Sequence, residues 1–225
     1  MISLASITLA TALSYFQAYP REARAALDFA SEHKTEIKEL KKYLSDEDAR
    51  LAMCIVAPEV SQYSTFSDKA ETFALYTLYV QGHSTNFSIG LFQMKPSFAV
   101  DIENEVTKHE YLSKYKSLII NKPTDRAARN ERVQRLTTLR WQLVYLAAFV
   151  DIARQRTKGK SFATTEEMLK YWGTLYNAGV NIADSKIYRH YSVEGFPRIS
   201  SCSFNYGDVC IEFYHDTIYC SFLTE

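Results

Sequence analysis

The sequence predicts a mainly α-helical protein that ends in a small β-hairpin. Several long stretches carry apolar residues at helical spacing with no glycine inside them. Ser or Thr stands three positions before an acidic residue at the start of three of these stretches, which is a helix-capping signature. Near the C-terminal end, β-branched and aromatic residues alternate instead. At 225 residues the chain can bury a substantial core and requires no second domain.

The N-terminal segment allows two interpretations. Residues 1–20 hold a short apolar run and an Ala10-Thr11-Ala12 that resembles a signal-peptidase site, yet they lack the usual basic start. They are either an export signal or an amphipathic first helix. Residues 21–43 are rich in Ala, Glu, Lys and Leu, which predicts an exposed amphipathic helix.

The next helix is predicted to be buried. Ser45 and Asp48 form a capping signature, and the run "ARLAMCIVA" that follows is apolar almost all round. Pro58 should end or kink this helix. Thr65 and Asp68 then cap a further helix, "KAETFALYTLYVQ", which Gly82 ends.

Loops and helices alternate through the middle of the chain. Residues 83–94 should form a loop or short strands, and Pro96 should open a helix through residue 108. Residues 125–156 predict one long helix whose apolar second half, "WQLVYLAAFVDIA", is central. One more helix follows the cap Thr164 and ends at Gly179.

The C-terminal stretch "CSFNYGDVCIEFYHDTIYCSF" predicts the hairpin, with its turn at His215-Asp216. Three of the four cysteines, Cys202, Cys210 and Cys220, crowd this region, which suits an oxidising compartment and a bond between two of them. A two-residue turn would place Cys210 and Cys220 on opposite faces, so that pair would need another turn. Buried thiols, Cys54 included, are the alternative, and the pairing stays open.

Charge and hydropathy exclude some classes of protein. The 26 basic and 26 acidic side chains give a net charge of zero, unlike a nucleic-acid-binding domain. No later stretch has the roughly 18 uncharged apolar residues of a membrane span. The 16 tyrosines and 13 phenylalanines suit stacking on sugar faces, or simply fill the core.

Glu59 is the acid most suited to catalysis. It follows "CIVAP" at the end of the predicted buried helix, and an apolar setting raises a carboxyl pKa so that it can donate a proton near neutrality. An exposed helix-end glutamate is the plainer alternative. Glu71, one turn after Asp68, is a second candidate, although most such acids are solvated helix charges.

Two further motifs could surround this acid. In "SIGLFQM", which supplies Ser88, Gly90, Leu91, Gln93 and Met94, the glycine lets a ligand approach the backbone. The amide of Gln93 could bind a polar group, and Met94 could pack on an apolar sugar face.

The second motif, "YWGTLYNAG", ends a helix with Tyr176 and Asn177, whose polar tips could orient a nearby carboxyl. Each motif alone would also suit an ordinary turn or helix end.

Taken in order, the acid, "GLFQM" and "YNAG" resemble the lysozyme-like superfamily, in particular the soluble lytic transglycosylases and goose-type lysozymes of glycoside hydrolase family 23. The resemblance covers roughly residues 46–180 and implies Glu59 as acid/base, Gly90, Leu91, Gln93 and Met94 as cleft residues, and Tyr176, Asn177 and Gly179 as the third motif. Val60 stands where the family has serine, and Phe92 stands where it has methionine. Glu59 also lies 31 positions before Gly90, further than typical transglycosylases place their acid, and this spacing keeps Glu71, which is nearer to Gly90, as a rival or second carboxylate.

The resemblance implies a lysozyme-like helical domain over residues 46–180, with extensions at 1–45 and 181–225. It implies cleavage of the glycosidic bond between N-acetylmuramic acid and N-acetylglucosamine in peptidoglycan strands, by one carboxyl that is first acid and then base. We expect no metal or other cofactor, no nucleic-acid partner, a monomer, and export to the periplasm or cell envelope.

Two other functions remain open from the sequence. The chain could be a saccharide-binding or cell-wall scaffold protein that kept the cleft and lost turnover, which the altered motifs would suit. It could also be a helical interaction protein in which the three motifs coincide by chance.

Overall fold

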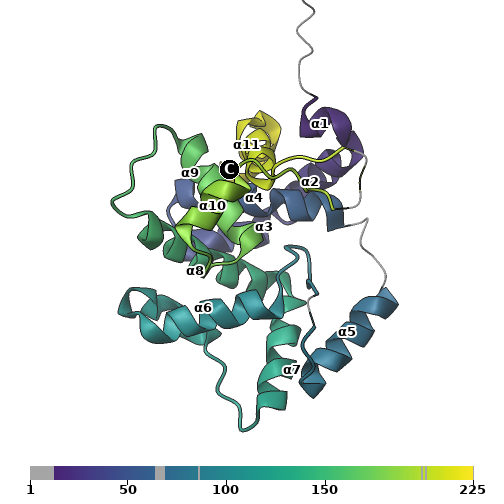
Figure 1. Ribbon diagram of the computed structural model, residues 1–225, viewed down its shortest axis with the longest axis vertical. Helices are drawn as coiled ribbons and strands as arrows, with labels where there is room; N and C mark the ends of the chain where they lie inside the picture. The colour runs from purple at the N-terminus through teal and green to yellow at the C-terminus, as the bar shows by residue number, and fades with distance from the viewer. Residues whose placement is uncertain (1–12, 64–68, 86, 199, 201, 225) are drawn as a thin grey trace, which may run out of the picture.

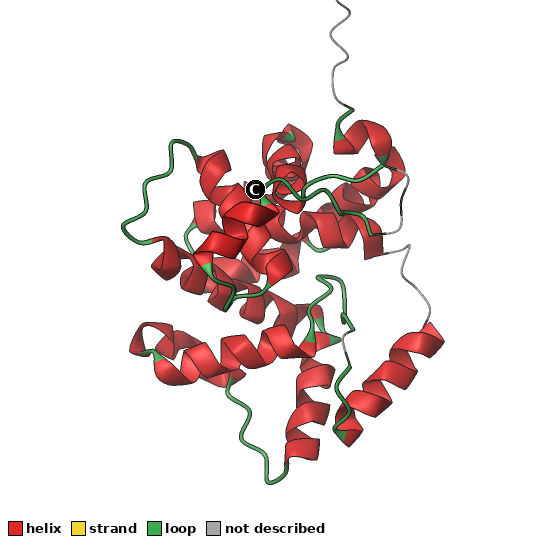
Figure 2. Ribbon diagram, in the orientation of Figure 1, coloured by secondary structure: helices red, strands yellow, loops and turns green. Residues whose placement is uncertain are grey.

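The computed structural model describes residues 13–63, 69–85, 87–198, 200 and 202–224, with only the backbone given for residues 69–73 and 224. These residues form a bundle of helices joined by loops (Figures 1 and 2). In these ranges β-pairing is limited to two isolated bridges, Ile89–Met94 and Phe196–Phe204. The prediction of a mainly helical protein is confirmed. No helix among the described residues has the length and apolarity needed to cross a membrane.

The N-terminal helices are shorter than predicted. After α1 (Tyr15–Ala18), the expected helix over residues 21–43 divides into α2 (Pro20–Glu32), α3 (Lys34–Ile37) and the 3₁₀ helix η1 (Lys38–Lys42). The chain leaves helical geometry at His33 and takes the tighter 3₁₀ form in η1. Ile37 and Leu40, which follow the break at His33, are both buried.

Helix α4 (Asp46–Gln62) is the centre of the fold. Ser45 caps it by accepting a hydrogen bond from the Asp48 backbone N–H, as the sequence predicts. Helices α2, α8, α9, α11 and α12 all pack against it, so it is buried along most of its length. The helix does not end at Pro58, which lies inside it, and Glu59 is therefore in its last turn.

A second group of helices lies beside the first (Figure 1). It contains α5 (Lys69–Gln81), α6 (Pro96–Lys108), the 3₁₀ helix η3 (Glu110–Leu118) and α7 (Asp125–Leu136). Helix α8 (Leu139–Thr157) connects the two groups, since it packs on α4, α6 and α7. The single helix predicted over residues 125–156 is thus two helices, because the chain leaves helical geometry at Thr138.

The predicted C-terminal hairpin is wrong. After α9 (Thr165–Ala178) and α10 (Asp184–His190), the chain forms α11 (Tyr206–His215) and α12 (Thr217–Thr224). Asn205 and Asp216 cap these helices through their side chains. Tyr206, Val209, Cys210 and Phe213 are buried at helical spacing, so the aromatic and branched residues follow a period of 3.6 rather than 2.

Two glycines allow α9 and α11 to pack closely. A Cβ at Gly173 would lie 2.7 Å from Cys210 Sγ, and one at Gly207 would lie 2.8 Å from the Lys170 carbonyl oxygen. The second contact is with backbone, which cannot rotate away. Close packing of these helices therefore depends on the absence of a side chain at Gly207.

We expect Gly207→Ala to lower the free energy of unfolding by about 1–3 kcal/mol, since overpacking forces the two helices apart. Gly195→Ala is the matched control, because a Cβ there meets nothing within 4 Å, and it should stay within about 0.5 kcal/mol of wild type. Urea denaturation measures both. A Gly207→Ala variant as stable as Gly195→Ala would show that the helices are not in such close contact.

Candidate active site

Glu59 differs in its surroundings from Glu103, a buried glutamate of α6. Glu103 is paired, since its carboxylate accepts hydrogen bonds from Arg132 at 2.6 and 2.8 Å and from Tyr145 at 2.7 Å. Glu59 is half-buried in the last turn of α4, and its carboxyl group forms no hydrogen bond or ion pair with the described residues. A carboxyl group held this way is poorly solvated and has no hydrogen bond from the described residues to stabilise its charged form.

This setting changes the acidity of Glu59. Burial among protein atoms raises the pKa of the Glu59 carboxyl to about 7, while the positive charges of Arg198 and Lys95 act in the opposite direction. Burial also lowers the pKa of Lys95, with Arg198 contributing. A carboxyl with a pKa near 7 can both donate and accept a proton at neutral pH.

Two residues of helix α11 lie near Glu59. The Tyr206 hydroxyl and the Cys210 thiol both donate to the Ile55 carbonyl oxygen of α4, at 3.0 and 3.7 Å. Burial raises the pKa of both groups well above the usual range, and the negative charge of Glu59 adds to the effect. The sequence predicts a hairpin for this segment, so it places neither residue beside Glu59.

The "GLFQM" motif is a tight turn closed by a β-bridge. Ile89 and Met94 exchange backbone hydrogen bonds of 2.9 and 3.1 Å. Inside the turn, the Gln93 backbone N–H and its side-chain amide both donate to the Gly90 carbonyl oxygen, at 3.0 and 2.8 Å. Gly90 and Gln93 have positive φ angles of 72° and 47°. A glycine suits the positive φ at position 90, where the sequence had suggested the approach of a ligand to the backbone.

A buried glutamine of α8 holds this turn in place. The side-chain oxygen of Gln142 accepts a hydrogen bond from the Phe92 backbone N–H at 2.8 Å, and its NH₂ group donates to the Leu136 carbonyl oxygen at 2.5 Å. Gln142 is 1% exposed. Its one sequence signal was a lone amide inside the apolar run "WQLVYLAAFV".

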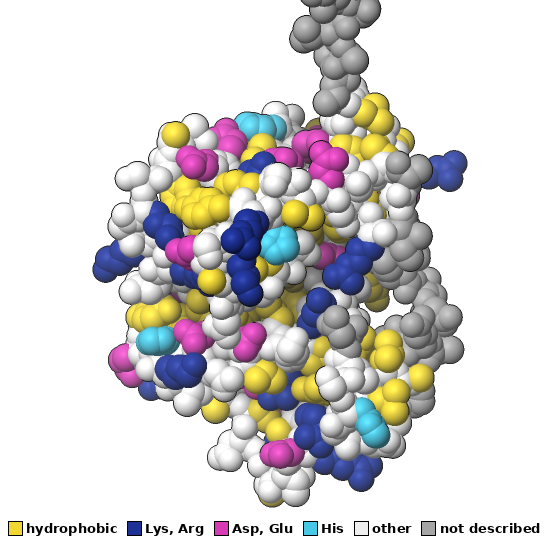
Figure 3. All heavy atoms as spheres, in the orientation of Figure 1, with side chains coloured by type: hydrophobic (Ala, Val, Ile, Leu, Met, Phe, Trp, Pro, Cys, Tyr) yellow, Lys and Arg dark blue, Asp and Glu magenta, His cyan; other side chains and the backbone are white. Residues whose placement is uncertain are grey.

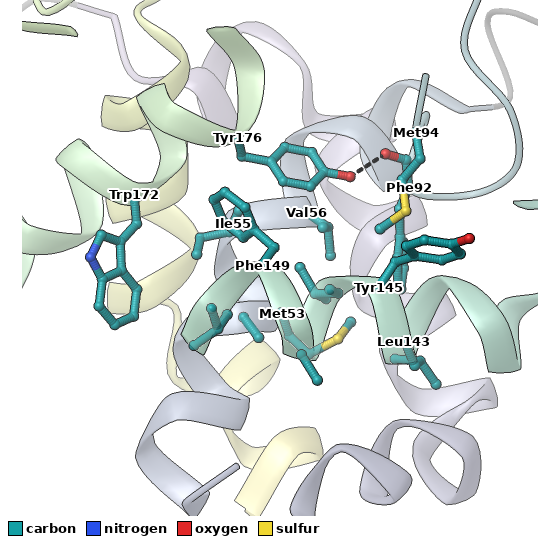
Figure 4. Packing of buried hydrophobic residues seen from close by; sticks show 14 of the residues in the cluster. Met53, Ile55, Val56, Phe92, Met94, Leu143, Tyr145, Phe149, Trp172 and Tyr176 are labelled. Carbon is teal, nitrogen blue, oxygen red and sulfur yellow. Dashed lines mark hydrogen bonds between the residues drawn. The ribbon is translucent and has the colours of Figure 1, made fainter. Parts of the chain in front are cut away.

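Tyr176 joins the third motif to the second. Its hydroxyl donates to the Phe92 carbonyl oxygen at 2.6 Å, so both backbone groups of Phe92 are held from outside the turn (Figure 4). The tyrosine also lies within electrostatic reach of Glu59, whose charge adds to burial in raising the Tyr176 pKa. The ring of Tyr176 stacks with that of Tyr206, 6.5 Å between centroids. The structure thus brings together Glu59, the turn and the tyrosine of the third motif.

The remaining predicted site residues differ in exposure. Ser88, Gly90, Leu91 and Gln93 are partly exposed, and Asn177 is exposed just before the C-cap Gly179. Met94 is 1% exposed and packs in the core, where it cannot contact a sugar without movement (Figure 4). The side chain of Glu71 lies outside the described residues.

Two cations that the sequence did not indicate lie near Glu59. Lys95 follows the turn directly and is the N-cap residue of α6. Arg198 is in the loop that the Phe196–Phe204 bridge closes. In the space-filling view the surface is hollowed between the two groups of helices, and Lys or Arg side chains lie at its rim (Figure 3).

The described residues also bear on two other kinds of site, a metal site and a separate pocket. No group of three or more His, Cys, Asp or Glu side chains among them could hold a metal ion. A small pocket lies between η1 and the start of α8 and is not lined by Glu59 or by the motif residues. Its lining residues are Glu39, Leu40, Lys42, Tyr43, Arg140, Leu143 and Val144.

Comparison of the chain with protein-family models, with curated proteins and with solved structures finds no match.

The turn should be sensitive to substitution at Gly90. A Cβ there would lie 1.6 Å from Gln142 Nε2 and 2.4 Å from the Leu136 carbonyl oxygen. Gly159 has a similar φ of 84° but nothing within 4 Å of its Cβ, so Gly159→Ala isolates the cost of the backbone conformation.

We expect Gly159→Ala to lose about 1–2 kcal/mol of stability, and Gly90→Ala to lose roughly 1–3 kcal/mol more, because the Gln142 side chain must be displaced. Urea denaturation of both variants checks this. Equal losses would show that the Gln142 contact contributes nothing.

Proposed function

We propose that this protein is a peptidoglycan-cleaving glycosidase of the lytic transglycosylase or lysozyme type, with Glu59 as its single general acid/base. The observation that carries the proposal is the carboxyl of Glu59, which has no partner among the described residues and a pKa of about 7. Tyr176 supports it, since this residue links the turn of the second motif to the surroundings of Glu59.

In the proposed reaction, protonated Glu59 donates its proton to the glycosidic oxygen as the bond to C1 breaks. The substrate's own acetamido group shields the positive charge that develops at C1, so no second protein carboxylate is needed. This step departs from the two-carboxylate scheme of most glycosidases. Among the described side chains, no other acid contributes to the pKa of Glu59.

Ionised Glu59 then acts as base. If it removes the proton of the muramic 6-hydroxyl, the hydroxyl oxygen attacks C1 and the product is an internal anhydro sugar. If it removes a proton from water, the product has a reducing end. The same residue performs both proton transfers, for which a pKa near the working pH is favourable.

The cations near Glu59 favour an anionic glycan. Lys95 and Arg198 place positive charge beside the carboxyl, and muramic acid carries a carboxylate that a neutral glycan lacks. Of the Gln93 amide, one N–H is used on Gly90, which leaves its other N–H and its oxygen for sugar hydroxyl or acetamido groups. Because the substrate lies outside the cytoplasm, the proposal includes export.

Losing a general acid or base typically lowers a rate by about 10²–10⁴-fold. Because Glu59 would fill both proton-transfer roles, Glu59→Gln should lower the release of soluble muropeptides from purified sacculi by about 10⁴-fold or more. Glu71→Gln is the control and should cost much less. Circular dichroism of both variants should match wild type, and Glu59→Gln should still co-sediment with sacculi.

The mass of the released products identifies the reaction. Anhydro ends, one water lighter than reducing ends, indicate transglycosylation, whereas reducing ends indicate hydrolysis. An active Glu59→Gln variant would remove the assignment. A wild-type protein that binds sacculi without releasing muropeptides would be a saccharide-binding protein instead.

A further inference from the structure

Two cysteines meet where the last helix packs on α4. Cys54 is buried in α4, and Cys220 lies partly exposed in α12. The preceding residues fix the two helices at this level, because the Tyr219 hydroxyl donates to the Met53 carbonyl oxygen at 3.0 Å. Cys54 and Cys220, the residues that follow Met53 and Tyr219, are therefore both at the α4–α12 contact.

The two thiols lie within interaction range of each other. Cys54 forms a side-chain hydrogen bond with Cys220, and the Cys220 thiol also reaches the Tyr214 carbonyl oxygen at 3.2 Å. The hydrogen bond from Cys54 lowers the pKa of Cys220, and the nearby Arg50 guanidinium adds to this, while burial raises the pKa of Cys54. Cys220 is thus the more reactive thiol and the one that solvent reaches.

The other two cysteines have different surroundings. Cys210 is fully buried on α11, and its thiol donates a hydrogen bond to the Ile55 carbonyl oxygen. Cys202 lies in the loop before α11, where its carbonyl oxygen accepts a hydrogen bond from Tyr19. None of the four cysteines is in a disulfide bond in the structure.

We propose that Cys54 and Cys220 are an oxidisable pair that forms a disulfide bond between α4 and α12. The oxidant is a small or protein disulfide. The Cys220 thiolate attacks one sulfur of that disulfide, which forms a mixed disulfide and releases the first thiolate. Deprotonated Cys54 then attacks the Cys220 sulfur and releases the second thiolate, so the pair loses two electrons and two protons and the oxidant becomes two thiols.

This bond would fasten the C-terminal helices to the helix that carries Glu59. Helix α12 packs on both α4 and α11, and α11 provides Tyr206 and Cys210 beside Glu59. The bond would also close a loop of most of the chain, which restricts the unfolded state strongly. The proposal does not depend on the reaction proposed for Glu59.

The test uses the purified full chain, treated with oxidised glutathione or with dithiothreitol, then alkylated under denaturing conditions and digested without reduction. Mass spectrometry of the oxidised sample should find a Cys54–Cys220 linked peptide pair, with Cys202 and Cys210 alkylated. The melting temperature of the oxidised protein should exceed that of the reduced protein by about 5–15 °C. This difference should vanish in Cys220→Ser and persist in the matched control Cys202→Ser.

Four alkylated cysteines after oxidation would overturn the proposal, as would a linked pair that includes Cys202 or Cys210. Glutathione retained on Cys220 without the internal bond would also overturn it, because Cys54 would then fail to displace it. Mass spectrometry of the digested wild-type protein tests the proposal even if a serine variant does not fold.

Discussion

The burial of helix α4 is the constraint on which the rest of the structure depends. A helix packed on several sides cannot move its last turn away from the core, so Glu59 is held in a poorly solvated position at the end of that helix. Proline inside a helix removes one backbone hydrogen bond and disturbs the carbonyl groups of the preceding turn. For Pro58 the carbonyl that loses its helical donor is that of Cys54. On either side of it, side chains of the neighbouring helices donate hydrogen bonds to carbonyl oxygens of α4, Tyr206 and Cys210 to that of Ile55 and Tyr219 to that of Met53.

The turn over residues 89–94 depends on a second set of buried polar contacts. The break between α7 and α8 leaves the Leu136 carbonyl oxygen available to Gln142, and the same side chain binds the backbone of Phe92. Tyr176 binds Phe92 from the other helix group. Because each of these polar groups is buried and partnered, displacing one leaves its partner unsatisfied. The turn and the third motif are therefore held in one arrangement beside α4.

Local signals in the sequence were sufficient for part of this architecture. The caps at Ser45 and Thr164 and the start of α6 at Pro96 depend on local backbone chemistry, and the structure has each of them. The high pKa of Glu59 was also predictable, because it follows from an apolar run that ends in an acid.

Other features depend on tertiary contacts that a single sequence does not reveal. The hairpin prediction for the C-terminal segment is wrong because aromatic and branched residues at helical spacing also alternate locally. The packing on α4 and α9 favours the helix. The role of Gln142 depends on a turn distant in sequence. Lys95 and Arg198 come near Glu59 through the folding of two separate loops, so no local pattern contains them.

The central claim is that the fold keeps the Glu59 carboxyl protonated up to near-neutral pH. Carbon-13 NMR of the full chain, labelled at the glutamate side-chain carboxyl carbons, measures this directly, and Glu59→Gln assigns the resonance. The protonated form is favoured in the folded state, so the resonance should titrate with a midpoint of about 7 rather than at the ordinary value of 4.5. A midpoint near 4.5 would show that Glu59 is well solvated and would contradict the account.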